Sequence, residues 1–264
     1  MERALMDLQA YFSRIGFAGD ARPDLATLQS LHLAHVMSVP FENLTVQMGE
    51  PVRLEPEALE EKLVRRRRGG YCFEQNGFFL AVLRQLGFDV AAYEARVRPP
   101  GLADLLPRTH MNLRVALPEG AFLVDVGFGG QGLRGPLPLD GAAHRQGPDE
   151  FRVIPEGRLL LLQSRQDLQW QDLYAIEPEP KAPIDFEVAN WYTSTHPQSR
   201  FVLTLTAQKP TPTGRHILRG LSYTVVDGDR AEERTLTRDE VLPLLRDVFG
   251  LDLPEDTRLR SLET

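Results

Sequence analysis

The chain contains a single cysteine, Cys72, in the stretch RGGYCFEQN that spans residues 68–76. A lone cysteine is most often a small buried apolar residue, and that is the first interpretation to weigh. Its neighbours favour another one, because Gly69 and Gly70 allow a tight backbone turn or the close approach of a ligand, and apolar residues follow with helical spacing over 79–86. We therefore expect Cys72 in the first turn of a helix, where free N–H groups and the helix dipole favour the nucleophilic thiolate.

A nucleophilic cysteine needs a base, and His110 is the best placed of the histidines. In the stretch THMNLRV, strand alternation puts His110, Asn112 and Arg114 on one face, opposite an apolar face. A hydrogen-bonded histidine in a half-buried strand is the alternative interpretation. His32 and His35 share a helix face, but no cysteine or carboxylate cluster near them supports a metal site. The remaining histidines are His144, His196 and His216.

The base in turn needs an orienting group, and Asp125 in FLVDVGFGG lies where a strand would carry an aliphatic residue. A buried carboxylate requires a partner. If the loop LPEG joins two strands with Ala116 opposite Ala121, His110 and Asp125 lie diagonally on one face, whereas a slip of one residue would separate them. The hairpin therefore predicts a His–Asp pair, which Cys72 would complete as a Cys–His–Asp triad.

The elements that must position these residues change in kind along the chain. Helical patterns cover 2–17, 24–37, 55–67 and 72–87. Strand patterns follow at 88–98, 109–117, 121–127, 151–154, 158–163 and 168–175. The tail predicts strands near 201–207 and 221–227 and a helix over 238–249. This order predicts an α+β fold with domains at 1–87, 88–183 and 184–264.

Composition excludes several classes of protein. No apolar run approaches the ~20 residues that cross a bilayer, and the N-terminus lacks the features of a signal peptide, so we expect a cytoplasmic protein that does not act on membranes. With 30 basic and 37 acidic residues the net charge is −7, which argues against a nucleic-acid partner. The run from Arg65 to Arg68 is interpreted as a solvated helix end. The sequence leaves the oligomeric state open.

One glycine pattern is typical of dinucleotide-binding proteins, but the residues that follow it argue against that function. Gly127, Gly129 and Gly132 match G-x-G-x-x-G after a strand, but Pro136 and Pro138 prevent the helix that a dinucleotide-binding turn requires. The glycines could instead let a ligand with phosphates or a pantetheine arm come close to the predicted base.

Taken together, the sequence motifs resemble one known family, the arylamine N-acetyltransferases. The resemblance runs through most of the chain, in order, at YFSRIG, HVMSVPFENL, RRGGYCFEQN, THMNL, VDVGFGG and NWYTSTHPQSRF, which lie between residues 11 and 201. It implies a helical first domain, a β-barrel-like second domain and an α/β lid around a papain- and transglutaminase-like core. Gln75 and Asn112 depart mildly from the family pattern, which more often has apolar residues there.

The resemblance also implies roles for individual residues. It makes Cys72 the nucleophile, His110 the base and Asp125 the group that orients the base. It places Phe41, Phe128 and Phe201 around the acyl and arylamine pocket, and it places Gly127, Phe128, Gly129 and Gly130 at the acetyl-CoA cleft.

The implied reaction is acetylation of arylamines or hydrazines by acetyl-CoA in two steps through an acetyl-cysteine, with no metal. A related amide synthase or other acyltransferase with a different acyl donor is the main alternative. A transglutaminase-like hydrolase or a non-enzymatic relative is the second.

Overall fold

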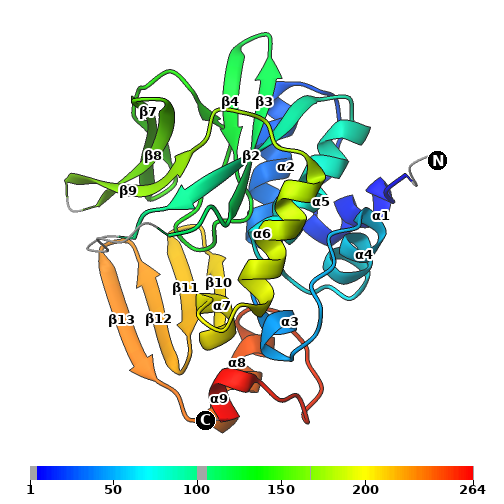
Figure 1. The fold of residues 1–264 in the computed structure, drawn as a ribbon, viewed down its shortest axis with the longest axis vertical. Helices are drawn as coiled ribbons and strands as arrows, with labels where there is room; N and C mark the ends of the chain where they lie inside the picture. The colour runs from blue at the N-terminus through cyan, green and yellow to red at the C-terminus, as the bar shows by residue number, and fades with distance from the viewer. Residues whose placement is uncertain (1–4, 100–105, 167, 264) are drawn as a thin grey trace.

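The N-terminal part of the chain is helical, as expected, in a computed structural model that describes residues 5–99, 106–166 and 168–263. Its helices are α1 (Leu8–Ile15), α2 (Leu25–Ser38), α3 (Leu44–Gln47), α4 (Pro56–Glu60) and α5 (Cys72–Gln85) (Figure 1). The helix predicted over 2–17 is shorter because Gly16 ends it in a left-handed conformation at φ 70°, and residues 2–4 of that prediction lie outside the described residues. The helix predicted over 55–67 continues from α4 as a π-helical segment, Glu61–Arg65.

The central strands form a strongly curved sheet, which is eight-stranded within the described residues, in the order β5-β4-β3-β2-β9-β8-β7-β6. Its strands are β2 (Asp89–Val97), β3 (His110–Leu117), β4 (Gly120–Val124), β5 (Leu137–Pro138), β6 (His144–Gln146), β7 (Asp149–Glu156), β8 (Leu159–Gln166) and β9 (Gln169–Ile176). Because β5 also packs against β7, the sheet nearly closes into a barrel. The predicted hairpin register is confirmed, with Ala116 opposite Ala121.

A second sheet combines one strand from the N-terminal part of the chain with strands from the C-terminal part. Its order is β1-β10-β11-β12-β13, so β1 (Phe41–Glu42), which precedes α5 in the chain, pairs with β10 (Thr206–Pro210). The other strands are β11 (Gly214–Arg219), β12 (Ser222–Asp227) and β13 (Arg230–Thr235), and α8 (Arg238–Asp247) and α9 (Arg260–Glu263) complete this region.

One strand prediction in the tail is wrong. Residues near 201–207 do not form one strand, because Arg200–Leu203 is the short helix α7, and the strand begins at Thr206. The Ser199 side chain explains the helix start, since its oxygen accepts a hydrogen bond from the Phe201 N–H. The helix before it, α6 (Pro183–Thr195), crosses the front of the molecule in Figure 1.

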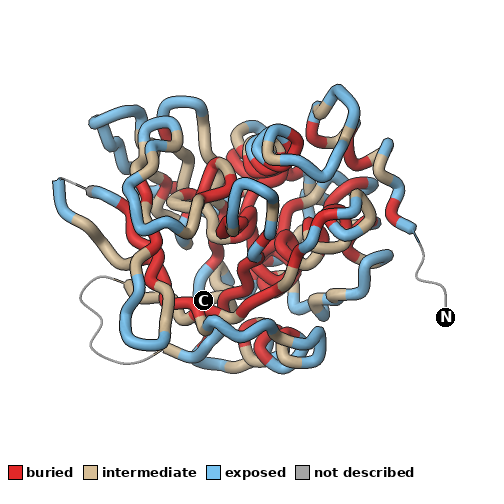
Figure 2. The backbone as a smooth tube through the Cα atoms, turned by 90° about the horizontal axis from the view of Figure 1, so that it is seen from above, coloured by how far each residue is buried: buried red, intermediate tan, exposed pale blue. Residues whose placement is uncertain are grey.

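Buried apolar side chains form three clusters in the described part of the chain. Figure 2 marks the buried residues in red along the backbone. One cluster lies between the helices and the outer face of β2–β4, one fills the barrel, and one lies between the second sheet and α8. Strand β3 is therefore covered on both faces, which buries His110 and Asn112 at the barrel side. The three-domain division stays a prediction.

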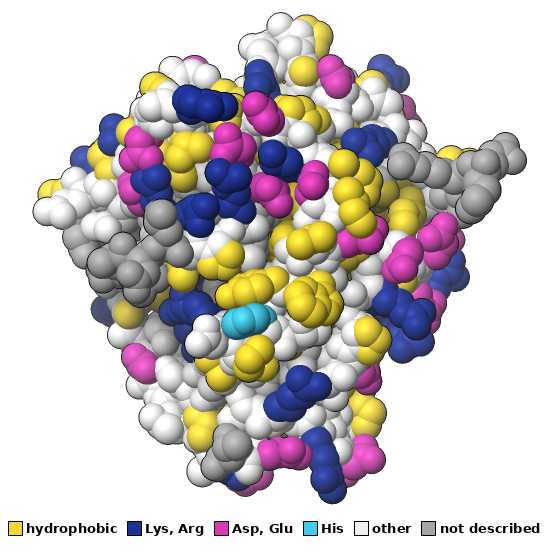
Figure 3. Space-filling view, in the orientation of Figure 1, with side chains coloured by type: hydrophobic (Ala, Val, Ile, Leu, Met, Phe, Trp, Pro, Cys, Tyr) yellow, Lys and Arg dark blue, Asp and Glu magenta, His cyan; other side chains and the backbone are white. Residues whose placement is uncertain are grey.

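The face seen in Figure 3 mixes acidic and basic side chains around a central group of apolar ones. Exposed apolar side chains on α6 are Ile184, Val188 and Trp191. Among the described residues, no helix is both long and apolar enough to cross a bilayer.

Candidate active site

Cys72 is the first residue of α5, as predicted, and its side chain is buried. The helix start is stabilised by Glu74, whose Oε2 accepts a hydrogen bond from the Tyr71 N–H at 3.1 Å. The turn before it requires glycine for close approach, because a Cβ on Gly69 would lie 2.1 Å from the Pro40 carbonyl oxygen. The sequence therefore holds the thiol at a rigid helix N-terminus, with Sγ 3.5 Å from the Thr109 carbonyl oxygen.

The predicted His–Asp pair is present in the structure. His110 Nε2 lies 2.7 Å from Asp125 Oδ2, and neither side chain is exposed to solvent by more than 3%. Burial alone would lower the pKa of His110, but the charge of Asp125, their hydrogen bond and the contact with Cys72 raise that pKa to about 10. At neutral pH the geometry thus favours an imidazolium beside the sulfur.

The carboxylate of Asp125 is held by donors on each of its oxygens. Oδ2 also accepts from the Tyr174 hydroxyl at 2.8 Å, and Oδ1 accepts from Asn76 Nδ2 at 2.8 Å and the Gly127 N–H at 2.9 Å. Burial would raise the pKa of Asp125, but the charge of His110 and these hydrogen bonds hold it below its usual value.

Sequence reasoning assigned no role to Asn76 or Tyr174. The spacing of Asn76 four residues after Cys72 puts the two side chains on one helix face, and that signal was available. Tyr174 lies 49 residues from Asp125 along the chain, and nothing in its local pattern indicates the contact.

The glycine-rich turn after β4 packs closely against the start of α5. A Cβ on Gly127 would lie 2.7 Å from Cys72 Cα and 2.8 Å from Asn76 Nδ2, so only glycine lets the turn approach the helix this closely. Farther along, the Gly130 N–H donates to Gln208 Oε1 at 2.8 Å, which links the turn to the second sheet. The segment Leu137–Pro138 that follows is a strand, so the rejection of a dinucleotide-binding helix agrees with the structure.

The aromatic residues predicted for the pocket fall into two groups. The Phe128 ring lies against His110 with centroids 5.2 Å apart. The rings of Phe41 and Phe201 lie 6.0 Å apart, and Phe201 also contacts the ring of Tyr71 at 5.5 Å. Phe128 thus lies beside His110, whereas Phe41 and Phe201 lie on the side of Tyr71, the residue before Cys72.

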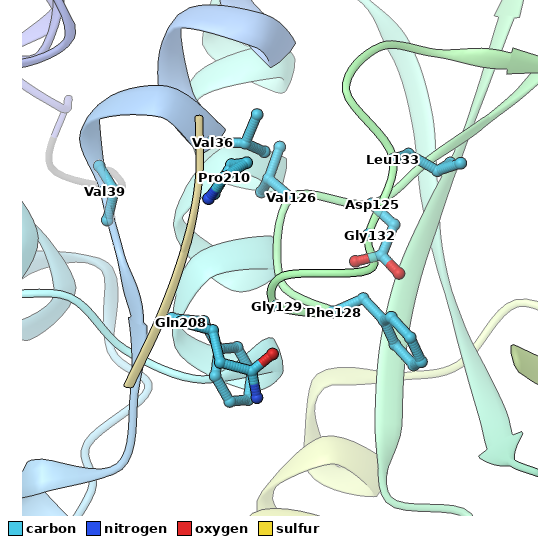
Figure 4. A pocket seen from close by; sticks show the side chains of 11 residues that line it. Val36, Val39, Asp125, Val126, Phe128, Gly129, Gly132, Leu133, Gln208 and Pro210 are labelled. Atoms are coloured by element: carbon cyan, nitrogen blue, oxygen red, sulfur yellow. The ribbon is translucent and has the colours of Figure 1, made fainter. Parts of the chain in front are cut away.

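A pocket opens between the end of α2, the glycine-rich turn and β10 (Figure 4). Among the predicted residues, Phe41, Phe128 and Gly129 line it, together with Asp125. Cys72 and Phe201 are not among its lining residues.

The two histidines weighed as metal ligands have other partners. The His35 ring lies between the Tyr11 hydroxyl at 2.9 Å and Gln75 Oε1 at 3.2 Å. His32 Nε2 accepts from the Asp125 backbone N–H at 3.4 Å. Burial lowers the pKa of His32 to about 4 and that of His35 to about 3, so each ring is neutral at pH 7. No metal-binding group of side chains occurs in the described residues.

The two departures from the family pattern are accommodated differently. Both polar groups of the Gln75 amide have hydrogen-bond partners, because its Oε1 contacts His35 and its Nε2 donates to the Gly70 and Pro40 carbonyl oxygens. Asn112 donates to the Tyr93 carbonyl oxygen at 3.3 Å, while its buried Oδ1 has no partner within the described residues.

The interpretation of the arginine run as a solvated helix end is wrong for Arg68. Arg65 and Arg66 are exposed and pair with Glu60 and Glu61, but Arg68 reaches the fully buried Glu42 at 2.9 Å. A buried carboxylate requires such a partner, which explains the difference.

Comparisons with known proteins assign the chain to a family. The sequence profile of the N-acetyltransferase family matches residues 24–258. An arylamine N-acetyltransferase from Mycolicibacterium smegmatis is 44% identical over 255 residues, covering 94% of this chain and 93% of the relative. One from Escherichia coli is 37% identical over 255 residues, covering 94% and 90%.

Solved structures agree with this assignment. An M. smegmatis arylamine N-acetyltransferase superimposes with a TM-score of 0.93 at 41% identity, covering 98% of each chain. The Mycobacterium marinum enzyme in complex with CoA gives a TM-score of 0.88 at 38% identity, covering 93% of each chain. The protein is thus a mixed helix-and-sheet acyltransferase with a barrel-like central sheet. It belongs to the arylamine N-acetyltransferase family.

Proposed function

We propose that this protein transfers the acetyl group of acetyl-CoA to an arylamine or arylhydrazine through an acetyl thioester on Cys72. The observation that carries the proposal is the buried His110–Asp125 pair at 2.7 Å, placed beside the thiol at the start of α5. The names of the relatives and the CoA complex of the M. marinum enzyme support this choice of donor and acceptor.

The first half-reaction forms the acetyl-enzyme. The Cys72 thiolate attacks the thioester carbonyl, backbone donors including the Cys72 N–H stabilise the oxyanion, and the bond to the CoA sulfur breaks. The proton of the His110 imidazolium passes to the departing thiolate. Asp125 keeps the imidazole oriented throughout.

The second half-reaction uses the same site. The amine nitrogen attacks the acetyl-cysteine carbonyl, His110 accepts the amine proton, and the C–S bond breaks to restore the Cys72 thiolate. Phe41, Phe128 and Phe201 offer an apolar surface to the aryl ring, and the turn at Gly129 and Gly130 borders the CoA arm.

Gly127 is better explained as a packing position than as a direct CoA contact, because Cys72 Cα occupies the space a side chain would need. The α/β lid and the papain-like core are part of the same proposal. The second sheet supports a covering role, since it reaches the glycine-rich turn through Gln208.

Intact-protein mass spectrometry after mixing with acetyl-CoA, without amine, tests the proposal. Wild type should gain one acetyl group, and Cys72→Ala should gain none. Double-reciprocal plots for the two substrates should then be parallel. No adduct together with intersecting lines contradicts the proposal, and an adduct with a carrier-bound acyl donor alone would favour the amide synthase alternative.

A further inference from the structure

Asn76 contacts the segments that carry both partners of the nucleophile. Its side chain is fully buried, and Nδ2 donates to the Met111 carbonyl oxygen at 2.7 Å and to Asp125 Oδ1 at 2.8 Å. Its Oδ1 accepts the Val126 N–H at 3.0 Å. Met111 follows His110 and Val126 follows Asp125, so one amide fixes the backbone next to each of these residues.

The same side chain is rigidly connected to the nucleophile. Asn76 lies one helical turn after Cys72 on α5, and the Gly127 Cβ position is closed by both Cys72 Cα and Asn76 Nδ2. Because Cys72 and Asn76 lie on the same helix, the hydrogen bonds of Asn76 fix the position of Cys72 relative to the segments that carry His110 and Asp125. These bonds therefore help to set the distance between the thiol and the base.

We propose that Asn76 is a positioning residue that fixes the His110–Asp125 pair relative to the Cys72 thiol. The inference rests on the proposed function and names how its triad is held together. Asn76 acts through Asp125 and the two strand ends, and it does not itself touch the reacting atoms. Tyr174 and the neutral His32 also contact Asp125, but among the described residues neither forms a hydrogen bond to α5.

A merely structural role is the competing explanation, and Gln75 provides the matched control. It is the preceding residue of α5, it is equally buried, and its amide also has several partners, namely His35, Gly70 and Pro40. None of its hydrogen bonds reaches His110 or Asp125. Asn76→Ala and Gln75→Ala therefore both remove a buried amide from one helix, but only the first loosens the pair.

The experiment compares the two variants by iodoacetamide alkylation of Cys72 across pH and by single-turnover acetylation with acetyl-CoA. Asn76→Ala should react with iodoacetamide more slowly than wild type near pH 7, because the His110 imidazolium would no longer be held beside the sulfur. Its acetylation should slow by about 100-fold, the effect of a displacement of about 1 Å in a reacting geometry. Gln75→Ala should keep the wild-type alkylation profile. Equal profiles in the two variants overturn the proposal.

A second variant covers the case in which Asn76→Ala does not fold. Asn76→Asp preserves the size of the side chain and the acceptor for the Val126 N–H, but it removes both donors and places a second carboxylate against Asp125. It should show the same slower alkylation, and an unchanged profile in folded protein overturns the proposal.

Alkylation requires no acetyl-CoA, which separates this inference from the proposed function. A wild type that is not acetylated, combined with a shifted profile in Asn76→Ala, contradicts the proposed function and supports the positioning role. A wild type that is acetylated, combined with unshifted profiles in both variants, supports the proposed function and contradicts the positioning role of Asn76.

Discussion

Two buried histidines lie against α5, His110 at Cys72 and His35 at Gln75, and they differ in charge. His110 and His35 are each exposed by 3% or less. The pKa of His110 is raised to about 10, whereas that of His35 is lowered to about 3. Burial acts in the same direction on the two rings, so their partners decide the outcome.

The partner of His110 is a carboxylate, and the partners of His35 are neutral. Asp125 attracts the protonated ring at 2.7 Å, while Tyr11 and Gln75 only complete hydrogen bonds to a neutral ring. Placing a carboxylate beside a buried histidine therefore converts a packing residue into an ionised one. The carboxylate in turn stays ionised because the charge of His110 and the hydrogen bonds from His110, Asn76 and the Gly127 N–H lower its pKa.

The largest expected effect comes from removing that charge. We expect Asp125→Asn to lose most activity, about 10⁴-fold, because an amide favours the wrong tautomer and does not stabilise an imidazolium. Steady-state rates and a thermal melt on the same preparation provide the measurement. Asp140→Asn, which alters an exposed His–Asp contact at 3.0 Å, is the control and should retain full activity. Wild-type turnover in folded Asp125→Asn would contradict the role of the charge.

The lowered pKa of His35 should make the stability of the protein depend on pH. Its folded-state pKa is lowered to about 3, so below the ordinary value of 6.5 the unfolded chain binds a proton that the folded chain does not. The free energy of unfolding should thus fall by about 1.4 kcal/mol per pH unit from this site as pH decreases from 6.5 toward about 3.

His35→Gln should remove that part of the slope, whatever its effect on stability at neutral pH. Urea unfolding at several pH values measures the slope in wild type and in His35→Gln. If the His35→Gln slope equals that of wild type, the neutral assignment is wrong.

A smaller effect is expected at Tyr174, which donates one hydrogen bond to Asp125 Oδ2. A hydrogen bond to a charged group contributes about 1.5 kcal/mol or more, so Tyr174→Phe should reduce kcat about tenfold. Tyr223→Phe removes a tyrosine hydroxyl that contacts His216 in the second sheet, and it should have no effect on kcat. Equal kcat values in the two variants would show that the hydrogen bond from Tyr174 to Asp125 does not contribute to catalysis.

The sequence was sufficient for the parts of the site that depend on local geometry. The hairpin register follows from alternation and a short loop, so it predicts the His110–Asp125 pair. The residue types predict that Cys72 completes a triad with this pair, but the contact itself depends on long-range packing of α5 against Gly127, for which the sequence carries no local signal. Asn76 and Tyr174 contact Asp125 from distant segments. The spacing of Asn76 after Cys72 places it on the same helix face, whereas no local pattern indicates Tyr174.

The same distinction holds for the fold. Long strands such as β2 and β3 were predicted within about one residue, because their buried faces alternate or run apolar. Strand β13 was missed since every one of its residues is exposed, so it carries no apolar alternation. The pairing of β1 with β10 joins residues far apart in the chain and has no local signal.

The most direct test of the difference between the two histidines is ¹⁵N NMR of the ring nitrogens at about pH 8, above the ordinary histidine pKa of about 6.5. We expect His110 to carry protons on both ring nitrogens at that pH. His35 should be neutral, with its proton on Nε2 toward Gln75 Oε1 and Nδ1 accepting from Tyr11. A neutral His110 at about pH 8 would contradict the account, because no imidazolium would then be available to hold the Cys72 thiolate.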